Sequence, residues 1–461
     1  MFDVDTIAAI STPSGEGGIG IVRISGPEAY AVGDQIFIPQ RGREQGYPLS
    51  RHLYHGHIFN EQEELVDEVL VSFMSAPHTY TCEDTVEVNC HSGIFTLRMI
   101  LSLILKKGAR LAEPGEFTKR AFLNGRIDLS QAESVLKLIK ARSEEGVKMA
   151  ARNVQGHLAQ KTSALRNDIM EILAQIEAVL DFPEEVENEA LIFANLKENI
   201  QTVIYSFNQM LQGTERGRAY QEGIDTAIIG KPNVGKSSLL NALLRQQRAI
   251  VHEVPGTTRD LLEGYLYVDG YPIRIIDTAG IRKTSDPVEQ EGISRSRSAA
   301  EQARLLLIVL DGSTSWSDED EALIAMIREG QSVIIVINKS DLPQRISTEA
   351  LKKRFAEVSI INTAIINNQG TKGLEEEIIR LLDRDLGHGG ENPILIGLRH
   401  EEAAREALLF LDRASAAVDS QPLELVSLEL RQAWRKLGEI TGEAVTDELL
   451  DRIFSQFCLG K

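Results

Sequence analysis

The sequence has few cysteines and no long apolar run, and each shortage excludes a class of protein. Its three cysteines, Cys82, Cys90 and Cys458, cannot form a disulfide framework and show no CxxC spacing of the kind found in metal sites. The longest purely aliphatic runs, 305–310 and 333–337, fall far short of the roughly 20 residues of a membrane span. Acidic side chains stand near the start, where a signal peptide carries lysine or arginine. We expect a reduced, cytoplasmic protein with no membrane contact.

Positive charge is also scarce. Lys and Arg number 49 against 68 Asp and Glu, which gives a formal net charge of −19. Because attraction to phosphate needs a positive field, this composition excludes a general nucleic-acid binder. Contact with RNA would need a partner's surface or a local basic patch, for which the candidates are Arg142, Lys148, Arg152 and Lys161. We prefer to interpret that patch as an ordinary solvated helix face.

The remaining composition is that of a globular protein, and 461 residues suggest about three domains at roughly 150 residues each. The first 120 or so residues read as a compact α+β unit, with strands at 19–24 and 84–89 and a helix at 94–107. Apolar residues then recur at helical spacing, first between 130 and 180 and again over 193–212, 400–418 and 428–437. These segments predict a helical domain.

A different pattern separates the two helical stretches. Between residues 223 and 385 short apolar strands alternate with helices, which predicts a doubly wound α/β unit with a parallel sheet. We therefore expect a multidomain α/β protein in which this unit is inserted into the helical domain. The predicted domains are 1–121, 122–220, 221–385 and 386–461, the second and fourth being the two parts of the helical domain.

A phosphate-binding motif opens the α/β unit. Residues 230–237 read G-K-P-N-V-G-K-S, which fits G-x-x-x-x-G-K-[ST] between a strand and a helix. In such a loop the backbone N–H groups surround phosphate oxygens, Lys236 supplies positive charge and the Ser237 hydroxyl binds Mg²⁺. A glycine-rich turn without a ligand is the simpler alternative, but the strand, the spacing and the helix together favour the phosphate site.

Two further motifs follow later strands. Residues 277–280 read D-T-A-G, in which Asp277 can hold Mg²⁺ through water and the Gly280 N–H can sense the γ-phosphate. Residues 338–341 read N-K-S-D, and the Asp341 carboxylate can accept two hydrogen bonds from the N1–H and 2-amino groups of guanine. Adenine does not offer that pair, so the motif selects GTP. The short motif that would support the base gives a weaker signal, and our candidate for it is Thr363-Ala364.

In this order the motifs resemble those of the TrmE/Era-like branch of the translation-factor GTPases. Residues 256–260, G-T-T-R-D, resemble the switch I motif of that branch, which implies that Thr258 completes the Mg²⁺ coordination with Ser237. The motifs and the resemblance together assign to GTP the residues Asn233, Val234, Gly235, Lys236, Ser237, Ser238, His252, Glu253, Val254, Pro255, Gly256, Thr257, Thr258, Asp277, Thr278, Ala279, Gly280, Asn338, Lys339, Asp341, Thr363 and Ala364.

One departure from Ras-like GTPases concerns the catalytic water. Ile281 stands where those proteins carry a glutamine that orients the water, and an aliphatic side chain cannot do so. Asn233 could instead hold a monovalent cation beside the phosphates, and Glu289 could orient water. From the residues alone, Asn233 could equally be an ordinary loop residue and Glu289 a solvated carboxylate.

The chain also resembles the tRNA-modifying GTPases of the MnmE (TrmE) family. That resemblance implies K⁺ bound by Asn233, His252, Val254 and Thr257, and catalysis by Glu289 and Lys236. It further implies that the GTPase is activated by K⁺-dependent pairing of two G domains.

The resemblance covers both ends of the chain. The tail 457–461, F-C-L-G-K, resembles the C-terminal motif of the family and makes Cys458 a candidate functional thiol, although a lone terminal cysteine is often inert. The family's N-terminal domain resembles folate-binding one-carbon enzymes. It implies a 5,10-methylene- or 5-formyl-tetrahydrofolate bound by Arg23, Glu87, Arg126 and Lys461.

The resemblance implies an enzyme: a homodimeric GTPase that acts on tRNA with the FAD-dependent partner MnmG (GidA) in a heterotetramer-type complex. The pair would install an aminomethyl or carboxymethylaminomethyl group at C5 of the wobble uridine, position 34, of certain tRNAs. The alternative is an Era- or Der-like ribosome-assembly GTPase switch without modification chemistry. It explains the nucleotide motifs equally well, but neither the C-terminal motif nor the folate-like N-terminal unit.

Overall fold

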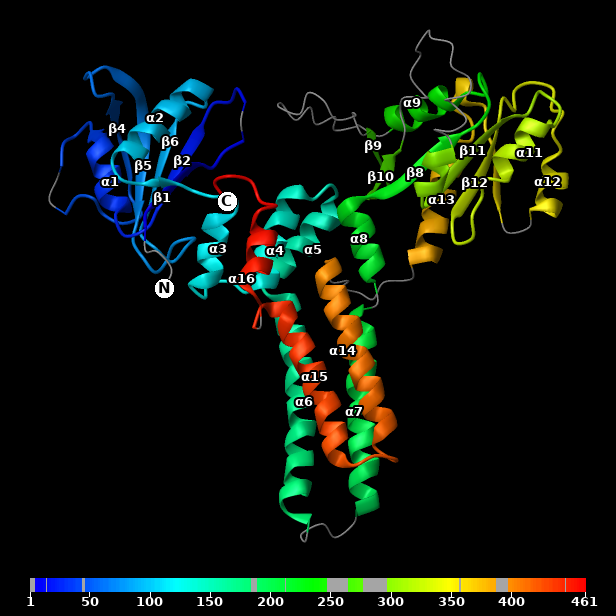
Figure 1. The fold of residues 1–461 in the computed structure, drawn as a ribbon. Coiled ribbons are helices and arrows are strands. Elements are labelled where there is room, and N and C mark those ends of the chain that lie inside the picture. Colours follow the sequence, from blue (N-terminus) through cyan, green and yellow to red (C-terminus); the bar gives the residue numbers. More distant parts are fainter. Residues whose placement is uncertain are drawn as a thin grey trace.

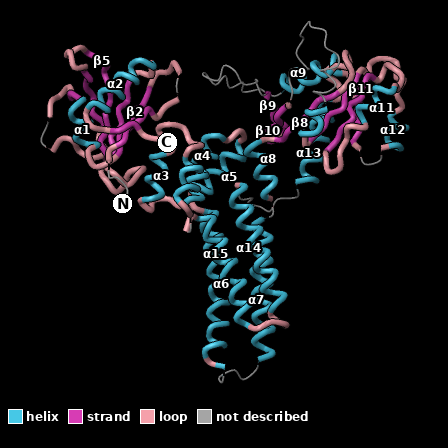
Figure 2. The backbone as a smooth tube through the Cα atoms, in the orientation of Figure 1, coloured by secondary structure: helices cyan, strands magenta, loops and turns pink. Residues whose placement is uncertain are grey.

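Three bodies make up the chain in the computed structural model: a sheet unit at each side and a long helical stalk between them (Figures 1 and 2). The C-terminus returns to the N-terminal unit and lies beside it (Figure 1). The structure describes residues 5–13, 15–43, 46–183, 189–211, 213–246, 264–276, 297–355, 358–386, 397–443 and 445–461.

The N-terminal unit is built on a seven-stranded sheet in the order β3-β4-β5-β6-β2-β1-β7, in which only the pair of β1 and β7 is parallel. Helices α1 (Ala29–Ile36) and α2 (Ile94–Lys106) pack on this sheet and share one apolar core with it. The predicted α+β unit is confirmed. The strands are β1 (Ile7–Ile10), β2 (Gly20–Ser25), β3 (Phe37–Pro39), β4 (Leu53–Phe59), β5 (Leu65–Met74), β6 (Thr85–Cys90) and β7 (Arg110–Leu111).

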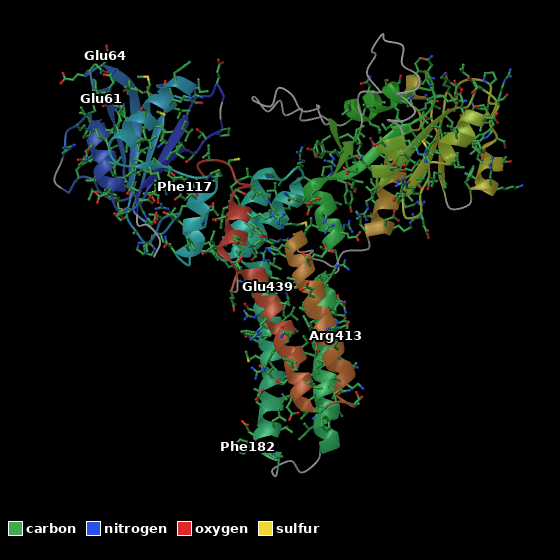
Figure 3. The ribbon with its side chains drawn as sticks, viewed as in Figure 1. Glu61, Glu64, Phe117, Phe182, Arg413 and Glu439 are labelled. Atoms are coloured by element: carbon green, nitrogen blue, oxygen red, sulfur yellow. The ribbon has the colours of Figure 1, made fainter. Side chains whose placement is uncertain are left out.

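The helical part holds a four-helix bundle of α6, α7, α14 and α15, whose buried faces form one apolar core. Phe182 lies at the far end of this bundle (Figure 3). The bundle joins helices that precede and follow the second sheet unit in the sequence, as predicted for an inserted unit. Its helices and their neighbours are α3 (Glu116–Leu123), α4 (Leu129–Lys140), α5 (Glu144–Val154), α6 (His157–Asp181), α7 (Glu189–Leu211), α8 (Thr214–Glu222), α14 (Leu398–Ala417), α15 (Leu423–Thr441) and α16 (Asp447–Phe454).

Two breaks divide the helical stretch that the sequence showed between 130 and 180. Ser143 caps α5 by accepting a hydrogen bond from the Gly146 N–H, and Gly156 takes a left-handed conformation (φ +91°) before α6. The apolar spacing did not reveal these breaks, and the three helices bury their apolar residues in three different cores.

The second sheet unit has six strands in the order β13-β12-β11-β8-β10-β9. Its central strands β11 and β12 are buried along their whole length, as expected for a parallel sheet covered on both faces. Five strands are parallel, and β9 runs antiparallel to β10, a hairpin that the sequence had not revealed. The elements are β8 (Ile224–Ile229), α9 (Lys236–Gln246), β9 (Gly264–Val268), β10 (Tyr271–Ile275), β11 (Leu305–Asp311), α11 (Asp318–Ile324), β12 (Ser332–Asn338), α12 (Thr348–Arg354), β13 (Ser359–Asn362) and α13 (Thr371–Leu386).

Candidate functional site

The loop between β8 and α9 approaches neighbouring groups so closely that only glycine fits at two positions. A Cβ on Gly230 would lie 2.4 Å from the carbonyl oxygen of Val309, and one on Gly235 would lie 2.3 Å from Nδ2 of Asn338. Both glycines also have positive φ, +156° and +107°. The sequence motif therefore forms a tight loop that runs directly into the first turn of a helix, the geometry that suits an anion.

Lys236 lies within this loop. Its Nζ donates hydrogen bonds to the carbonyl oxygens of Gly230 (2.7 Å) and Lys231 (2.8 Å), and burial lowers the pKa of its ammonium group. Ser237 and Ser238 are exposed at the start of α9, where the helix dipole favours negative charge. The loop thus gathers a cation, hydroxyls and a helix N-terminus, which can together bind phosphate and a divalent ion.

The second nucleotide loop is fastened to the first by Asn338. Its Nδ2 donates to the Val234 carbonyl (2.8 Å), and its Oδ1 accepts from Thr363 Oγ1 and from the Ile365 N–H, both at 3.3 Å. Asp341 follows in the same loop with an exposed side chain. Among the described residues, the structure therefore brings together the phosphate loop and the loop predicted to bind the base.

The neighbours of Asn338 complete this arrangement. Lys339 takes a left-handed conformation (φ +62°) and forms an ion pair with Asp311, which turns the chain toward the exposed Asp341. Thr363 and Ala364 are buried beside it, and the Thr363 carbonyl accepts from the Ser340 N–H at 3.0 Å. Asn233 is exposed in the phosphate loop with φ +65°, a conformation that asparagine tolerates better than most residues.

The predicted switch residues lie outside the described residues. These are His252, Glu253, Val254, Pro255, Gly256, Thr257, Thr258, Asp277, Thr278, Ala279, Gly280, Ile281 and Glu289.

A second polar cluster lies in the N-terminal unit. Arg23 on β2 and Glu87 on β6 face each other across the sheet and form an ion pair at 2.8 Å. The Arg23 guanidinium is 5.6 Å from the ring centroids of both Tyr80 and Phe117, and the Arg126 guanidinium is 4.5 Å from that of Tyr80. Figure 3 shows Phe117 where this unit meets the helical part. Two guanidinium groups, one carboxylate and an aromatic face suit a planar polar ring that carries carboxylates.

The C-terminal tail packs against the same unit. The Gly115 N–H donates to the Cys458 carbonyl (3.4 Å), and Gly460 has φ +86°. A Cβ on Gly460 would lie 2.2 Å from the carbonyl oxygen of Ile10, at the end of β1. Because β1 pairs with β2, the tail brings Lys461 to the sheet that carries Arg23, and it leaves the Cys458 side chain exposed.

Tyr80 and Phe117 were not among the predicted site residues, although Phe117 lies in the motif P-G-E-F-T at 114–118, at the start of α3. Arg142 was predicted to belong to a solvated basic patch. The structure places the Arg142 guanidinium 4.1 Å from the ring centroid of Tyr265, whereas Lys148 of the same patch pairs with Glu144 and Glu145.

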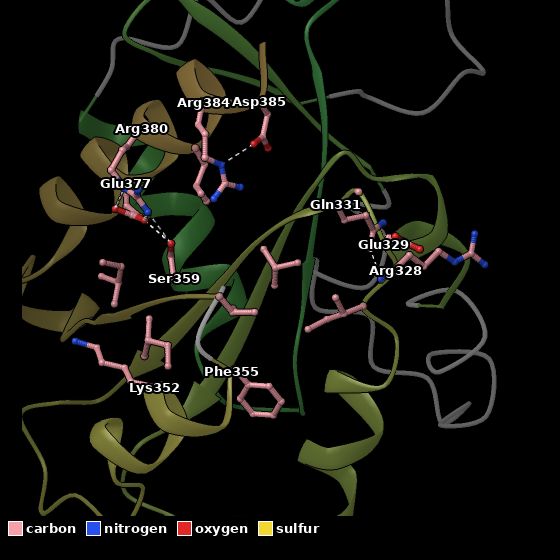
Figure 4. Close-up of a pocket in the computed structure, with 17 residues that line it drawn as sticks. Arg328, Glu329, Gln331, Lys352, Phe355, Ser359, Glu377, Arg380, Arg384 and Asp385 are labelled. Carbon is pink, nitrogen blue, oxygen red and sulfur yellow. Dashed lines mark hydrogen bonds and ion pairs between the residues drawn. The ribbon is translucent and has the colours of Figure 1, made fainter. Parts of the chain in front are cut away.

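A groove of about 970 Å³ lies at the end of the second sheet that is opposite to the nucleotide loops (Figure 4). It is lined by the starts of β12 and β13 and by the end of α13, and it contains no predicted site residue. Its arginines are already paired within the protein, Arg380 with Glu377 and Arg384 with Asp385. The groove therefore belongs to neither cluster described above.

Two features are absent from the part of the chain that the structure describes. None of its helices is long and apolar enough to cross a membrane. Nor do the described His, Cys, Asp and Glu side chains gather in a group of three or more that could hold a metal ion.

Comparison with solved structures found the G domain of the FeoB iron transporter of T. maritima, at 28% identity and a TM-score of 0.26. That match covers 34% of this chain and 98% of the other. Comparison with family models found two matches. The model of the MnmE helical domain matches residues 129–458, and that of the GTP-binding protein TrmE N-terminus matches residues 6–126.

Curated relatives match over the full length. The tRNA modification GTPase MnmE of Bacillus licheniformis is 44% identical over 460 residues, which covers 99% of this chain and 100% of the relative. The protein of the same name from Lacticaseibacillus paracasei is 47% identical over 459 residues, covering 99% of this chain and 98% of the relative. The chain therefore belongs to the MnmE family of tRNA modification GTPases.

Proposed function

We propose that this GTPase modifies tRNA together with an FAD-dependent partner of the MnmG type. The pair installs an aminomethyl or carboxymethylaminomethyl group at C5 of the wobble uridine, position 34. One observation carries the proposal: a single chain holds a phosphate-type loop fastened to the loop of Asp341 and, in a separate sheet unit against which its own C-terminal tail packs, an arginine–carboxylate–aromatic cluster. A nucleotide switch alone has no use for the second cluster.

In the nucleotide site, the loop N–H groups and Lys236 hold the phosphates, and Asp341 selects guanine. Ser237 and Thr258 would hold Mg²⁺, whose charge, when bound, would offset that of the phosphates. Asn233, His252, Val254 and Thr257 would hold K⁺. Glu289 assists the water, because Ile281 has no polar atom to orient it. The position of Asn233 in the phosphate loop, exposed and next to the buried Val234, supports the cation role.

The K⁺ proposal is tested by steady-state hydrolysis of GTP in KCl and in NaCl at equal ionic strength. We expect a faster rate in KCl, because the cation would supply the positive charge that other GTPases take from an arginine finger. Equal rates would overturn this part and leave the rest of the function standing.

In the N-terminal cluster, the ligand is a 5,10-methylene- or 5-formyl-tetrahydrofolate. Arg23, Arg126 and Lys461 would pair with its carboxylates, Glu87 would accept from the pterin N–H groups, and Tyr80 would stack on the ring. The arginines already lie against aromatic faces, so little side-chain entropy is lost on binding. The protein would act as a homodimer in a heterotetramer-type complex with its partner and tRNA.

Nucleoside mass spectrometry of total tRNA tests the function as a whole. In a strain that lacks this chain we expect the C5-modified wobble uridines to vanish, and to return when the intact chain is restored. Lys236→Ala should fail to restore them, whereas Lys372→Ala, at a residue whose side chain is 86% exposed, should succeed. An unchanged nucleoside profile together with altered ribosome profiles would instead support an Era- or Der-like assembly switch.

A further inference from the structure

The hairpin of β9 and β10 lies in sequence between the two motifs predicted to sense the nucleotide. Residues 256–260, G-T-T-R-D, precede β9, and residues 277–280, D-T-A-G, follow β10 almost directly. Covalent connection alone therefore ties this hairpin to both motifs. The contacts of the hairpin show which parts of the protein would move with it.

The hairpin touches the helical part through two aromatic residues. The ring of Tyr271 stacks on that of Tyr220 in α8, with centroids 4.4 Å apart and planes 8° from parallel. Tyr265 lies beneath the guanidinium of Arg142, which follows α4. Gly223 allows the close approach, because a Cβ there would lie 2.9 Å from the Pro272 carbonyl oxygen.

The contact continues into one apolar core rather than ending at a surface. Met149 and Ala150 of α5 and Tyr220 of α8 share a buried cluster with Tyr271 and Ile273 of the hairpin strand β10. A change in the hairpin cannot be absorbed locally, because such cores are close-packed and rearrange between discrete states.

Hydrogen bonds attach α8 to the end of α4. Gln221 Nε2 donates to the Lys137 carbonyl (2.7 Å), and Ser143 Oγ donates to the Tyr220 carbonyl (2.7 Å). The last turn of α4 is therefore held by α8, which in turn stacks on the hairpin.

The other end of α4 packs against the segment that leads to the C-terminal tail. Leu129 and Ala132 share an apolar cluster with Phe454 and Phe457, directly before Cys458. Between its two contacts α4 is a 12-residue helix, about 18 Å long at the usual rise per residue. Its first turn is closed by a capping box between Asp128 and Gln131.

We infer that α4 couples the nucleotide state of the G domain to the C-terminal tail, with Arg142, Tyr220 and Tyr265 as positioning residues. The inference rests on the proposed function, in which both ends of this path are working sites. A shift of the hairpin moves α8 and α4 together, and α4 moves the tail that carries Cys458 and Lys461 relative to the arginine cluster.

The reactivity of Cys458 toward iodoacetamide measures this coupling in the full chain. The rate is followed by mass spectrometry of the peptide that contains Cys458, with GDP and with a non-hydrolysable GTP analogue, in KCl. We expect the two rates to differ by at least about fivefold, the lower range of ordinary allosteric coupling. Cys90 serves as an internal comparator, since burial raises the pKa of its thiol to about 12 and it should react slowly in both states.

Arg142→Ala and Tyr265→Leu should each reduce the ratio of the two rates to below about twofold while GTP binding persists. The double variant should do no more than either single one, because the two residues form one contact. Lys140→Ala is the matched control, an exposed cation at the end of α4, and should keep the full ratio.

A ratio near one in the unaltered chain, an unchanged ratio in both contact variants, or an equal loss in Lys140→Ala would overturn the coupling. Calorimetry with tetrahydrofolate on the same proteins separates this from the proposed function. If tetrahydrofolate fails to bind while Cys458 still responds to nucleotide through Arg142, the folate site is wrong and the coupling stands. If tetrahydrofolate binds and Cys458 does not respond to nucleotide, the coupling is wrong and the folate site stands.

Discussion

Single polar side chains hold the nucleotide loops in register, and Asn338 is the clearest case. It uses both ends of its amide, one on the phosphate loop and the other on Thr363 and Ile365, and it is buried. A buried amide that makes three hydrogen bonds fixes distances between loops far better than exposed ion pairs do. These hydrogen bonds hold the loop that carries Asp341 beside the phosphate loop.

Asp341→Asn should change the base that this site prefers. An amide offers one acceptor where the carboxylate offered two, so GTP should bind roughly 100-fold more weakly, about 3 kcal/mol. Xanthosine triphosphate should gain, because its 2-carbonyl can accept from the new amide N–H. Competition binding with the two nucleotides measures this, and Asp269→Asn, at an exposed hairpin turn, is the control. An equal loss of affinity for both nucleotides would show that Asp341 has no part in base selection.

The loops that carry the nucleotide motifs could be predicted because each motif is contiguous in the sequence. The structure places Gly235, Lys236 and Asn338 in adjoining loops, and their binding of GTP stays a prediction. Tyr80 and Phe117 could not be found in this way. They come from separate segments and meet around Arg23 only through the folding of the N-terminal unit.

At the scale of elements, α4 and α14 are joined by a buried group of charges. Glu133 Oε2 lies 2.7 Å from Nε2 of His400, and Glu133 Oε1 lies 2.8 Å from Nε of Arg399. The Gly397 N–H lies 3.4 Å from Nδ1 of the same imidazole, and Nη2 of Arg399 lies 2.7 Å from its Nε2. Burial lowers the pKa of His400, although Glu133 opposes this. Lys137 also faces the group, and burial lowers the pKa of its ammonium.

Glu133→Gln should destabilise the protein in a pH-dependent way. Burial would raise the pKa of Glu133, but His400 and Arg399 outweigh it and hold the pKa at about 2, below the ordinary 4.5. A carboxylate whose folded pKa is depressed stabilises the fold above pH 4.5, and this contribution is lost as the pH falls toward about 2. We expect the variant to lose about 3 kcal/mol of unfolding free energy at pH 7 and progressively less below pH 4.5.

Denaturant unfolding at several pH values measures this difference. Glu424→Gln, at an exposed glutamate in the first turn of α15, should stay within about 0.5 kcal/mol of the unaltered protein throughout. A loss of stability that did not depend on pH would mean that Glu133 acts by packing alone.

The docking of the C-terminal tail depends on one glycine. Gly460→Val places a branched side chain where φ is +86° and where a Cβ would lie 2.2 Å from the Ile10 carbonyl oxygen. The tail should leave the sheet, and hydrogen exchange of the peptide after Phe457 should become at least about tenfold faster, while the melting temperature hardly changes. Gly373→Ala, where a Cβ meets nothing within 4 Å, is the control. Unchanged exchange would show that the tail is held by Phe457 rather than by its last residues.

Elements with a strong apolar period could be predicted from the sequence, and their ends follow from glycine or proline. The helix ending before Gly108 and the one ending before Pro183 are confirmed as α2 and α6. The hairpin of β9 and β10 was not predicted. Strand β9 pairs antiparallel at the sheet edge, where no long buried run marks a strand. Direction of pairing depends on tertiary contacts that a local pattern does not contain.

At the scale of the whole molecule, the buried core of the second sheet unit extends past the predicted start of the G domain. The predicted bound lies between residues 220 and 221, yet Tyr220 stacks on Tyr271 and shares the buried cluster of the second sheet. The sequence indicated a change of pattern at Gly223, where helix gives way to strand. It could not indicate that the last helix before that change packs on the sheet, because packing partners are set by three-dimensional proximity.

This core predicts that a G-domain fragment is more stable when it includes α8. A fragment of residues 214–385 should unfold at a temperature roughly 5 °C above one of residues 221–385. The reason is that it keeps Ala219 and Tyr220 buried against Tyr271, worth about 2 kcal/mol. Thermal unfolding followed by circular dichroism measures the difference. Tyr220→Ala in the longer fragment should remove most of it, whereas Glu222→Ala, at an exposed side chain of the same helix, should not. Equal melting temperatures of the two fragments would mean that α8 contributes nothing to the G-domain core.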